Sequence, residues 1–192
     1  AGGVALNCVV NGKLLRSGIF EDIYIQPAAG DAGGALGCAL LVWHQYLGKN
    51  RIVNNGEDSM KGAYLGPEYS NNEIEDYLNN NGYKFHKISD EELPEVVADL
   101  VAEQKVIGWF QGRMEFGPRA LGARTIIGDA RSPETQKIIN LKIKYRESFR
   151  PFAPSIREEN ISEYFDIKSP SPYMLLVANL KKDKQIPMTE EQ

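Results

Sequence analysis

The first fifty residues alternate between apolar segments of strand type and of helix type. Residues 4–15 are rich in apolar side chains and predict a strand end or turn that leads into a helix. Residues 23–26 alternate in polarity and stop at Pro27, which predicts a short strand. Residues 32–48 combine small and large apolar side chains and predict a buried helix that ends at Gly48. A strand, a small-residue turn and a helix in this order are typical of an α/β protein.

The rest of the chain shows helix and strand signals in mixed order. Residues 49–67 are polar and rich in Gly and Asn, which predicts a linker. Beyond it, a helix is predicted over residues 73–80, capped by Asn71 or Asn72 and followed by Gly82, and a second helix behind the capping-box pair Ser89 and Glu92. A third helix is predicted to start at Ser132-Pro133-Glu134 and to bury Ile138, Ile139 and Leu141. Strands are predicted at residues 106–110, 125–127 and 173–179. Two α/β units are therefore expected.

Composition narrows the class of protein further. The 192 residues are 42% hydrophobic and 25% charged, as in ordinary globular proteins. No segment reaches the roughly 18 apolar residues of a membrane span, and residues 1–7 lack a signal-peptide pattern, so a cytoplasmic location without membrane contact is expected. Cys8 and Cys38 lie among apolar residues and are predicted to be buried thiols. The net charge of -4 argues against a general nucleic-acid binder.

Positive charge is concentrated in one part of the chain. Between Arg113 and Arg150 there are nine Lys or Arg and four Asp or Glu, whereas the remaining residues have a clear excess of acids. One basic segment on an acidic protein indicates a local anion site. Counting alone leaves scattered surface Lys and Arg as an equally good interpretation.

The local sequence of this basic segment favours the anion site. Residues 108–131, GWFQGRMEFGPRALGARTIIGDAR, run from an apolar strand into a loop of glycines and arginines. Glycine lets the backbone approach a ligand closely, and the planar guanidinium matches phosphate oxygens. In residues 142–156, KIKYRESFRPFAPSI, the side chains of Lys142, Lys144 and Arg146 would face one side if the segment were extended. Such dense like charge repels unless an anion lies between, which predicts phosphate binding.

The same segments carry a family resemblance. GWFQGRMEFGPRALGARTI and KYRESFRPFAPSI closely resemble the C-terminal domain of the O-carbamoyltransferases of nodulation-factor, cephalosporin and aminoglycoside (tobramycin) biosynthesis. AGGVALNCVVNGKLL and QPAAGDAGGALGCAL are similar to the end of the N-terminal domain of these enzymes. The resemblance implies the remnant of a Kae-one-like (actin-like ATPase) domain over residues 1–50, a linker over residues 51–57, and a YrdC-like α/β domain over residues 58–192. Both domains are expected to continue beyond this chain.

The resemblance also implies a reaction at two sites. The YrdC-like domain forms carbamoyl-adenylate from carbamoyl phosphate and ATP, which is accompanied by Mg2+. The Kae-one-like domain uses Fe2+ or another divalent metal to pass the carbamoyl group to a hydroxyl of a small-molecule or sugar acceptor. Carried over to this chain, the residues that bind carbamoyl phosphate and ATP are Arg113, Arg119, Arg124, Lys144, Arg146 and Arg150, and the catalytic ones are Arg119, Lys144 and Arg150. Gln111 is a further contributor, and Glu115 is suited to orienting an arginine.

Asp31 is the metal ligand that the resemblance implies in this chain. From the residues alone, Asp31 is predicted as the N-cap of the helix behind it. His44 and His86 have no ligand spacing and are predicted to be structural or surface residues, and Trp43 and Trp109 are predicted to lie in the core. Because the family's histidine ligands have no counterpart here, the isolated chain is expected to bind anions without turning over.

Two other functions stay open. The YrdC/Sua-five threonylcarbamoyl-adenylate synthases are more loosely similar through Lys144, Arg146 and Arg150, so the alternative enzyme acts in tRNA modification and uses bicarbonate and threonine. A nucleic-acid-binding module would use the same basic segment, although the acidic total charge argues against it. The acceptor pocket is expected outside this chain, and an incomplete sheet edge would favour a homodimer.

Overall fold

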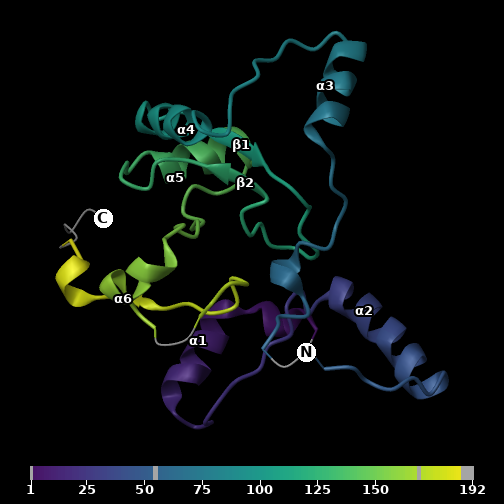
Figure 1. The fold of residues 1–192 in the computed structure, drawn as a ribbon. Coiled ribbons are helices and arrows are strands. Elements are labelled where there is room, and N and C mark those ends of the chain that lie inside the picture. Colours follow the sequence, from purple (N-terminus) through teal and green to yellow (C-terminus); the bar gives the residue numbers. More distant parts are fainter. Residues whose placement is uncertain (1, 54–55, 168–169, 187–192) are drawn as a thin grey trace. The chain divides into compact units, whose positions relative to one another are not determined.

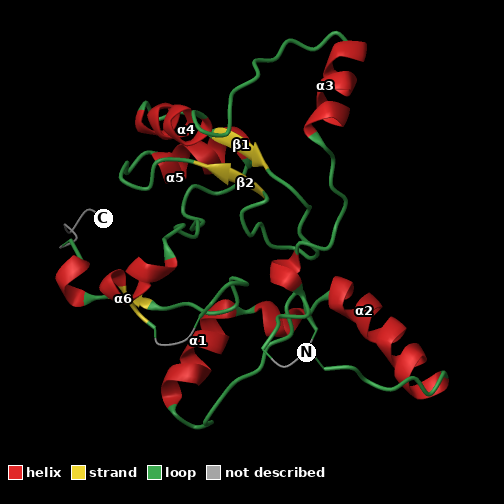
Figure 2. Cartoon of the chain, viewed as in Figure 1, coloured by secondary structure: helices red, strands yellow, loops and turns green. Residues whose placement is uncertain are grey.

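The computed structural model describes residues 2–53, 56–167 and 170–186. Short helices and two small antiparallel sheets make up the described chain, which agrees with the α/β class (Figure 1, Figure 2). The α-helices are α1 (Cys8–Ser17), α2 (Asp31–Leu41), α3 (Asn71–Asn80), α4 (Leu93–Ala102), α5 (Thr135–Ile138) and α6 (Ile161–Tyr164). The strands are β1 (Ile107–Phe110), β2 (Arg124–Ile127), β3 (Phe165–Asp166) and β4 (Asn179–Leu180). Short 3-10 turns lie at Gly3–Leu6, Lys61–Ala63, Glu158–Asn160 and Lys182–Lys184, and wider π-type turns extend α2 over Val42–Tyr46 and α5 over Ile139–Ile143.

The chain forms two compact units. The first contains the residues up to Leu65, the segment Glu115–Leu121 and the residues from Ser155 onward; the second contains Gly66–Met114 and Gly122–Pro154. This division differs from the domain bounds predicted over residues 1–50 and 58–192, and those family domains stay a prediction. Residues 54–55 of the predicted linker, and residues 168–169 and 187–192 of the predicted C-terminal domain, lie outside the described residues.

In the first unit, α1 binds the backbone of a segment for which a strand is predicted. Asn11 of α1 is buried and donates through Nδ2 to the carbonyl oxygen of Leu175 at 3.1 Å. Arg16 donates through Nη1 to the carbonyl oxygen of Val177. Because helix side chains occupy these carbonyls, the strand predicted over residues 173–179 is wrong, and only the short β4 pairs, with β3. The strand predicted over residues 23–26 is also wrong, since none of the described strands pairs with that segment.

The helix α2 is present, but it is exposed rather than buried. It contains no buried residue, and Leu41 and Trp43 are 56% and 50% exposed. The prediction that Trp43 lies in the core is therefore wrong, as is that of a buried Cys38; Cys8 is partly buried. An apolar helix is buried only where other elements cover it, and within the described parts of the chain none covers α2 to that degree. The predicted stop is confirmed, because the backbone turns at Gly48 with a φ of 60°.

The second unit is built on the hairpin of β1 and β2. The two strands pair antiparallel with Ile107 opposite Ile127 and Phe110 opposite Arg124, which confirms the strands predicted in these two places. With a single neighbour, β1 is half-exposed rather than buried. Figure 1 shows α4 and α5 beside the hairpin. A Cβ on Gly128, just beyond β2, would lie 3.0 Å from Cδ1 of buried Ile139, so the glycine allows this close packing.

Helix starts in the second unit follow local capping chemistry. For α3 the cap is Ser70 rather than Asn71 or Asn72: its Oγ accepts from the Glu73 N–H at 3.3 Å and its own N–H donates to the Glu73 carboxylate at 2.8 Å. The pair predicted in front of α4 does interact, through the bond from the Glu92 N–H to Ser89 Oγ, but the N-cap of α4 is Glu92 and has no side-chain cap. The start predicted for α5 is early, because residues 132–134 form a turn and the helix begins at Thr135.

The described residues bury few apolar side chains. The buried apolar residues are Ala28, Ala29, Ala63, Ala123, Ile139 and Leu175, and the buried polar ones are Asn11, Glu115, Asp129 and Asn140. Polar contacts of buried side chains therefore have a large share in ordering both units. In the described ranges, no helix has both the length and the apolar character that crossing a membrane requires.

Candidate anion-binding site

The basic residues from Lys142 to Arg150 follow directly on α5 in the second unit. The π-type turn that continues α5 places Asn140 inside, where it is 0% exposed. The chain then folds back on this turn: the Lys144 N–H donates to the Ile139 carbonyl at 2.9 Å, and the Arg146 N–H donates to the Asn140 carbonyl at 3.0 Å. These bonds satisfy carbonyls at the helix end and hold the following loop over Asn140.

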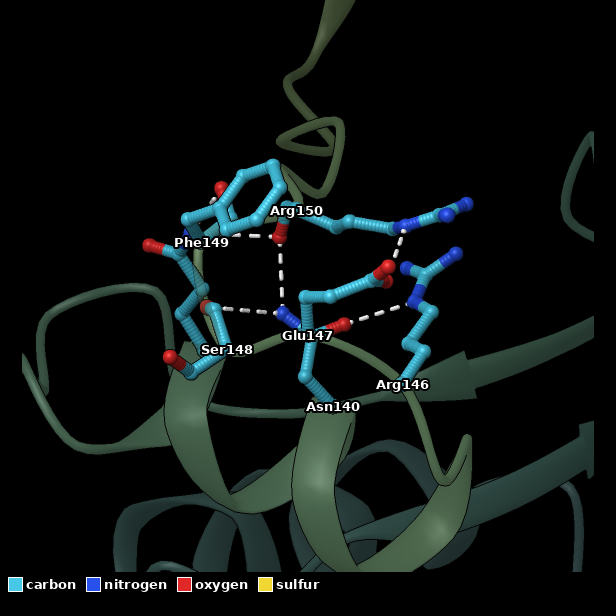
Figure 3. A network of polar contacts seen from close by, with 7 residues as sticks. Asn140, Arg146, Glu147, Ser148, Phe149 and Arg150 are labelled. Atoms are coloured by element: carbon cyan, nitrogen blue, oxygen red, sulfur yellow. Dashed lines mark hydrogen bonds and ion pairs between the residues drawn. The ribbon is translucent and has the colours of Figure 1, made fainter.

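The side chain of Asn140 makes hydrogen bonds to three residues of that loop. Its Nδ2 donates to the carbonyl oxygens of Ser148 at 3.0 Å and of Arg150 at 2.8 Å, while its Oδ1 accepts from Arg146 Nε at 2.7 Å. The Arg146 guanidinium also lies 5.0 Å from the ring centre of Phe152, a cation–π distance. Figure 3 shows the guanidinium groups of Arg146 and Arg150 pointing to the same side of the network. The structure therefore brings these two predicted site residues together.

A carboxylate accompanies the two arginines. Glu147 Oε2 accepts from Arg150 Nε at 2.8 Å, and the two side chains are 54% and 51% exposed. The pKa of Glu147 is lowered, first by a hydrogen bond from its own backbone N–H, then by the hydrogen bond from Arg150 and by the charges of Arg150 and Arg146. An ion pair this exposed contributes little to stability. Glu147 is therefore the counter-ion of Arg150 in this structure.

Both arginines keep donors for a ligand. Among the described residues, the side-chain hydrogen bonds of Arg146 and Arg150 run through their Nε atoms alone, to Asn140 and to Glu147. The Nη groups are thus left for other acceptors. Two guanidinium forks on one side suit the oxygens of a phosphate group, which accept charge-assisted bonds in pairs.

The predicted alignment of Lys142, Lys144 and Arg146 along an extended segment is wrong. Lys142 belongs to the π-type turn, Lys144 has αR backbone angles, and Tyr145 has a φ of 50°. On a helical backbone, residues two apart point to different sides. Local hydrogen bonding to the end of α5 therefore overrides the extended geometry that Pro151 and Pro154 suggest.

Two further predicted site residues of this unit have other surroundings. Arg113 follows β1 and is held by the segment before α3, through Nη1 to the Gly66 carbonyl at 3.2 Å and through Nε to Glu68 Oε2 at 3.3 Å. Arg124 opens β2 and is half-buried. The contacts described for the Asn140 network do not include either of them.

Arg119 belongs to the first unit, together with Glu115. Arg119 donates through Nη2 to the Leu6 carbonyl at 2.9 Å, and its Nε is buried without a hydrogen-bond partner among the described residues. Glu115 is 4% exposed, and its Oε1 accepts from the Leu121 N–H at 2.9 Å, so it fixes the backbone of this loop. Gly117 has a φ of 108°, and a Cβ there would lie 2.5 Å from the Ala28 Cβ. The glycine in this loop thus serves close packing within the first unit.

Asp31 opens α2 as its first helical residue. The N-cap is Gly30, so the predicted cap is wrong by one residue. The described residues contain no group of three or more His, Cys, Asp and Glu that could hold a metal ion. Catalytic zinc-type centres take three protein ligands as a rule, so these residues by themselves do not form a metal centre. His44 contacts the Lys49 carbonyl at 2.8 Å through Nδ1, which confirms a structural role.

The second unit also has a concavity of about 460 Å³ beside its hairpin. Its lining residues are Asp90, Leu93, Pro94, Val97, Trp109, Gln111 and Ile127. Trp109 is half-buried at its edge rather than in a core, and donates through Nε1 to Gln111 Oε1 at 3.2 Å. Arg146 and Arg150 are not among the lining residues. The arginine pair is therefore a surface site on the turn behind α5.

Sequence reasoning missed the residues that organise this pair. Asn140 and Glu147 are absent from the predicted site, as is Gln136, which donates to the carbonyls of Phe149 at 3.2 Å and Arg150 at 3.1 Å. One signal was present: Asn140 interrupts the apolar stretch Ile138-Ile139-Asn140-Leu141 on the side predicted to be buried. A buried polar side chain normally has a hydrogen-bonding task.

Family models match both parts of the chain. The carbamoyltransferase N-terminus model matches residues 1–40, which include Asp31, and the carbamoyltransferase C-terminus model matches residues 98–190, which include the whole basic segment. Together the two matches cover more than half of the chain. The chain belongs to the carbamoyltransferase family.

Relatives match along almost all of the chain. It is 58% identical over 194 residues to the uncharacterized protein sll1178 of Synechocystis, covering 100% of this chain and 31% of that protein. It is 45% identical to the nodulation protein NolO of Bradyrhizobium diazoefficiens, over 96% of this chain and 33% of the relative. It is 42% identical to the nodulation protein NolNO of Sinorhizobium fredii, over 96% of this chain and 27% of the relative. The chain thus spans about a third of the length of these relatives.

Proposed function

We propose that this chain supplies the site for carbamoyl phosphate and the phosphates of ATP in an O-carbamoyltransferase. Family membership supports the type of chemistry. The observation that carries the proposal is the pair Arg146 and Arg150, which is held on one side of the Asn140 network with its Nη groups available (Figure 3). Such forks bind phosphate and carboxylate groups through paired hydrogen bonds, and the substrates of the proposed reaction carry phosphate.

The proposed reaction activates the carbamoyl group as an adenylate. Water cleaves carbamoyl phosphate to carbamate and inorganic phosphate. A carbamate oxygen then attacks the α-phosphorus of ATP, and pyrophosphate leaves with the broken P–O bond, which gives carbamoyl-adenylate. The acceptor hydroxyl attacks the carbamoyl carbon, gives up its proton, and displaces AMP. In sum, carbamoyl phosphate, ATP, water and the alcohol yield the carbamate ester, AMP, pyrophosphate and phosphate.

In the proposal, the basic residues reduce the electrostatic repulsion between the two reactants. Carbamate and ATP are both anions, so their approach requires positive charge close to the reacting oxygens. In the proposal, Arg146 and Arg150 bind a phosphate group, and Arg113, Arg119, Arg124 and Lys144 complete the sites for carbamoyl phosphate and ATP. Arg119, Lys144 and Arg150 stabilise the charge that develops during phosphoryl transfer, and Mg2+ accompanies the ATP.

The proposal keeps the domain identities that the family resemblance implies. Residues 1–50 belong to a Kae-one-like (actin-like ATPase) domain, residues 51–57 are a linker, and residues 58–192 belong to a YrdC-like domain. Asp31 is one ligand of Fe2+ or another divalent metal, with the other ligands outside this chain. The proposed location is the cytoplasm.

The proposed acceptor is a hydroxyl of a small molecule or sugar. Support comes from the relatives named nodulation proteins, which agree with the resemblance to nodulation-factor carbamoyltransferases. No feature of the described residues favours one acceptor over another.

The test uses the complete natural protein, ATP and carbamoyl phosphate. Labelled pyrophosphate should exchange into ATP only when carbamoyl phosphate is present, and AMP should accumulate when acceptor alcohols are added. If exchange instead requires bicarbonate and threonine, the protein is a threonylcarbamoyl-adenylate synthase. A third outcome is that neither set of substrates supports exchange and that the protein binds oligonucleotides in a salt-sensitive way that carbamoyl phosphate does not displace. This result would show a nucleic-acid-binding module instead of an enzyme.

A further inference from the structure

Asn140 is a buried polar residue whose hydrogen-bonding groups are all used. It is 0% exposed, and its Nδ2 makes two bonds to loop carbonyls while Oδ1 accepts from Arg146 Nε. Its backbone carbonyl accepts from the Arg146 N–H at 3.0 Å. A buried amide is costly unless it is paired, so the loop must keep these positions for as long as Asn140 stays inside.

Three of these four bonds constrain one of the two arginines, and the fourth holds the Ser148 carbonyl. The Oδ1 contact fixes the guanidinium of Arg146 at Nε, which is the atom that sets the direction of the fork. The Nδ2 contact at 2.8 Å fixes the backbone of Arg150 at its carbonyl. One carboxamide therefore binds the guanidinium of Arg146 and the backbone of Arg150. An amide suits this task because it donates and accepts at once, whereas Asp accepts only and Leu does neither.

We infer that Asn140 is a positioning residue for phosphate binding: its carboxamide holds Arg146 and Arg150 in the relative placement that grips one phosphate group. The inference rests on the proposed function, because it concerns the same site. The ligand chemistry is a phosphate dianion or terminal phosphate, which carbamoyl phosphate and ATP share. Preorganisation of this kind raises affinity because the ligand need not order the side chains on binding.

A double-mutant cycle in the complete protein tests the inference. The variants are Asn140→Ala, Arg146→Ala and the double variant, and the probes are inorganic phosphate, carbamoyl phosphate and ATP in calorimetric titrations. Asn140→Ala should weaken phosphate binding about tenfold beside an intact Arg146, and by a clearly smaller factor when Arg146 is already Ala, where only the hold on the Arg150 backbone remains to be lost. Equal losses in both backgrounds, or no loss in the first, would overturn the inference. Weakening of ATP but not of carbamoyl phosphate would assign the pair to the nucleotide, and the reverse to carbamoyl phosphate.

A matched control separates positioning from general loosening of the loop. Gln136 donates to the carbonyl of Phe149 and to the same Arg150 carbonyl as Asn140, but none of its described hydrogen bonds reaches Arg146. Gln136→Ala should lower the melting temperature slightly and weaken phosphate binding by a clearly smaller factor than Asn140→Ala, because Arg146 stays held at Nε. If it weakens binding as much as Asn140→Ala does, general loop order explains the effect and the specific role of Asn140 is refuted.

A second variant keeps the test decisive if Asn140→Ala does not fold. Arg146→Lys keeps the positive charge at a partly exposed position but lacks the Nε–H that Asn140 holds. It should lose about as much phosphate affinity as Arg146→Ala, within about threefold. Wild-type affinity in Arg146→Lys would show that charge suffices without positioning, and the inference would fail. If the unmodified protein binds none of the three probes, the proposed function itself falls; binding that is normal in all variants removes only the inference.

Discussion

Replacement of Arg150 by alanine tests the candidate site most directly. The substitution removes one of the two guanidinium groups in Figure 3 and leaves Glu147 without its partner. The Arg150 carbonyl, which Asn140 binds at 2.8 Å, is a backbone group and stays. The change therefore acts on the charge at the site more than on the fold of the loop.

The structure sets the size of the effect. A hydrogen bond to a charged group is worth about 1.5–3 kcal/mol. Because the Arg150 side chain is 51% exposed, solvent screens its contact and the lower end applies, about 1.5 kcal/mol or roughly tenfold in affinity. The unpaired Glu147 carboxylate then repels the ligand as well. The double variant Arg150→Ala with Glu147→Gln should accordingly recover a factor of about two to five.

The assay is calorimetric titration of the complete protein with carbamoyl phosphate at low salt. Arg157→Ala is the matched control, because Arg157 also pairs with a nearby acid, Glu159, and is 79% exposed in the first unit. It changes the net charge equally and should leave the affinity unchanged. Unaltered affinity in Arg150→Ala, or an equal loss in Arg157→Ala, would remove Arg150 from the site and leave only a general charge effect.

Three further outcomes are expected. Glu147→Gln alone should strengthen phosphate binding by a factor of about two to five in the same titration, because it removes a competing anion; weaker binding would mean that the carboxylate positions the arginine. Burial, followed by the hydrogen bond to Asp58, raises the pKa of Tyr173 from 10.0 to about 12. The folded-state pKa is the higher one, so this contribution, which solvent screening keeps modest, is complete below pH 10 and is lost as the pH rises towards 12. Melting temperatures of Tyr173→Phe across this range should fall less steeply than those of the unmodified protein, and parallel curves would refute the coupling. Gly117→Ala should destabilise the protein by about 1–3 kcal/mol in thermal unfolding, because its Cβ would meet Ala28 at 2.5 Å and its φ is 108°; an unchanged melting temperature would contradict the packing.

The helices were predicted well from the sequence because the signals that start a helix lie in neighbouring residues. The serine and glutamate in front of α4 interact as predicted, since a capping box needs only residues three apart. The same chemistry operates at α3, although the capping residue is Ser70 instead of a neighbouring asparagine. The π-type extension of α5 left no comparable local signal, and it is this turn that places Asn140 inside.

The strand predictions were correct only where a partner strand exists. The segments at β1 and β2 pair with each other, whereas residues 23–26 and 173–179 have comparable local patterns and are not strands over their length. For the latter segment the reason is visible, because Asn11 and Arg16 of α1 bind its carbonyls. A strand requires backbone partners that lie far away in sequence, and alternation of side chains does not identify them.

Three features could be recognised without a structure: the concentration of arginine and lysine in one segment, the glycine loop, and the motifs by which the chain belongs to the carbamoyltransferase family. Which of these cations point to the same side could be seen only in the three-dimensional structure. Arg146 and Arg150 point to the same side of a network in which the buried amide of Asn140 binds the Arg146 side chain and the Arg150 backbone, while Lys142 and Lys144 follow the helical backbone. Composition and spacing are properties of the chain, whereas the direction of a guanidinium depends on hydrogen bonds that form only when the loop has folded back on the end of α5.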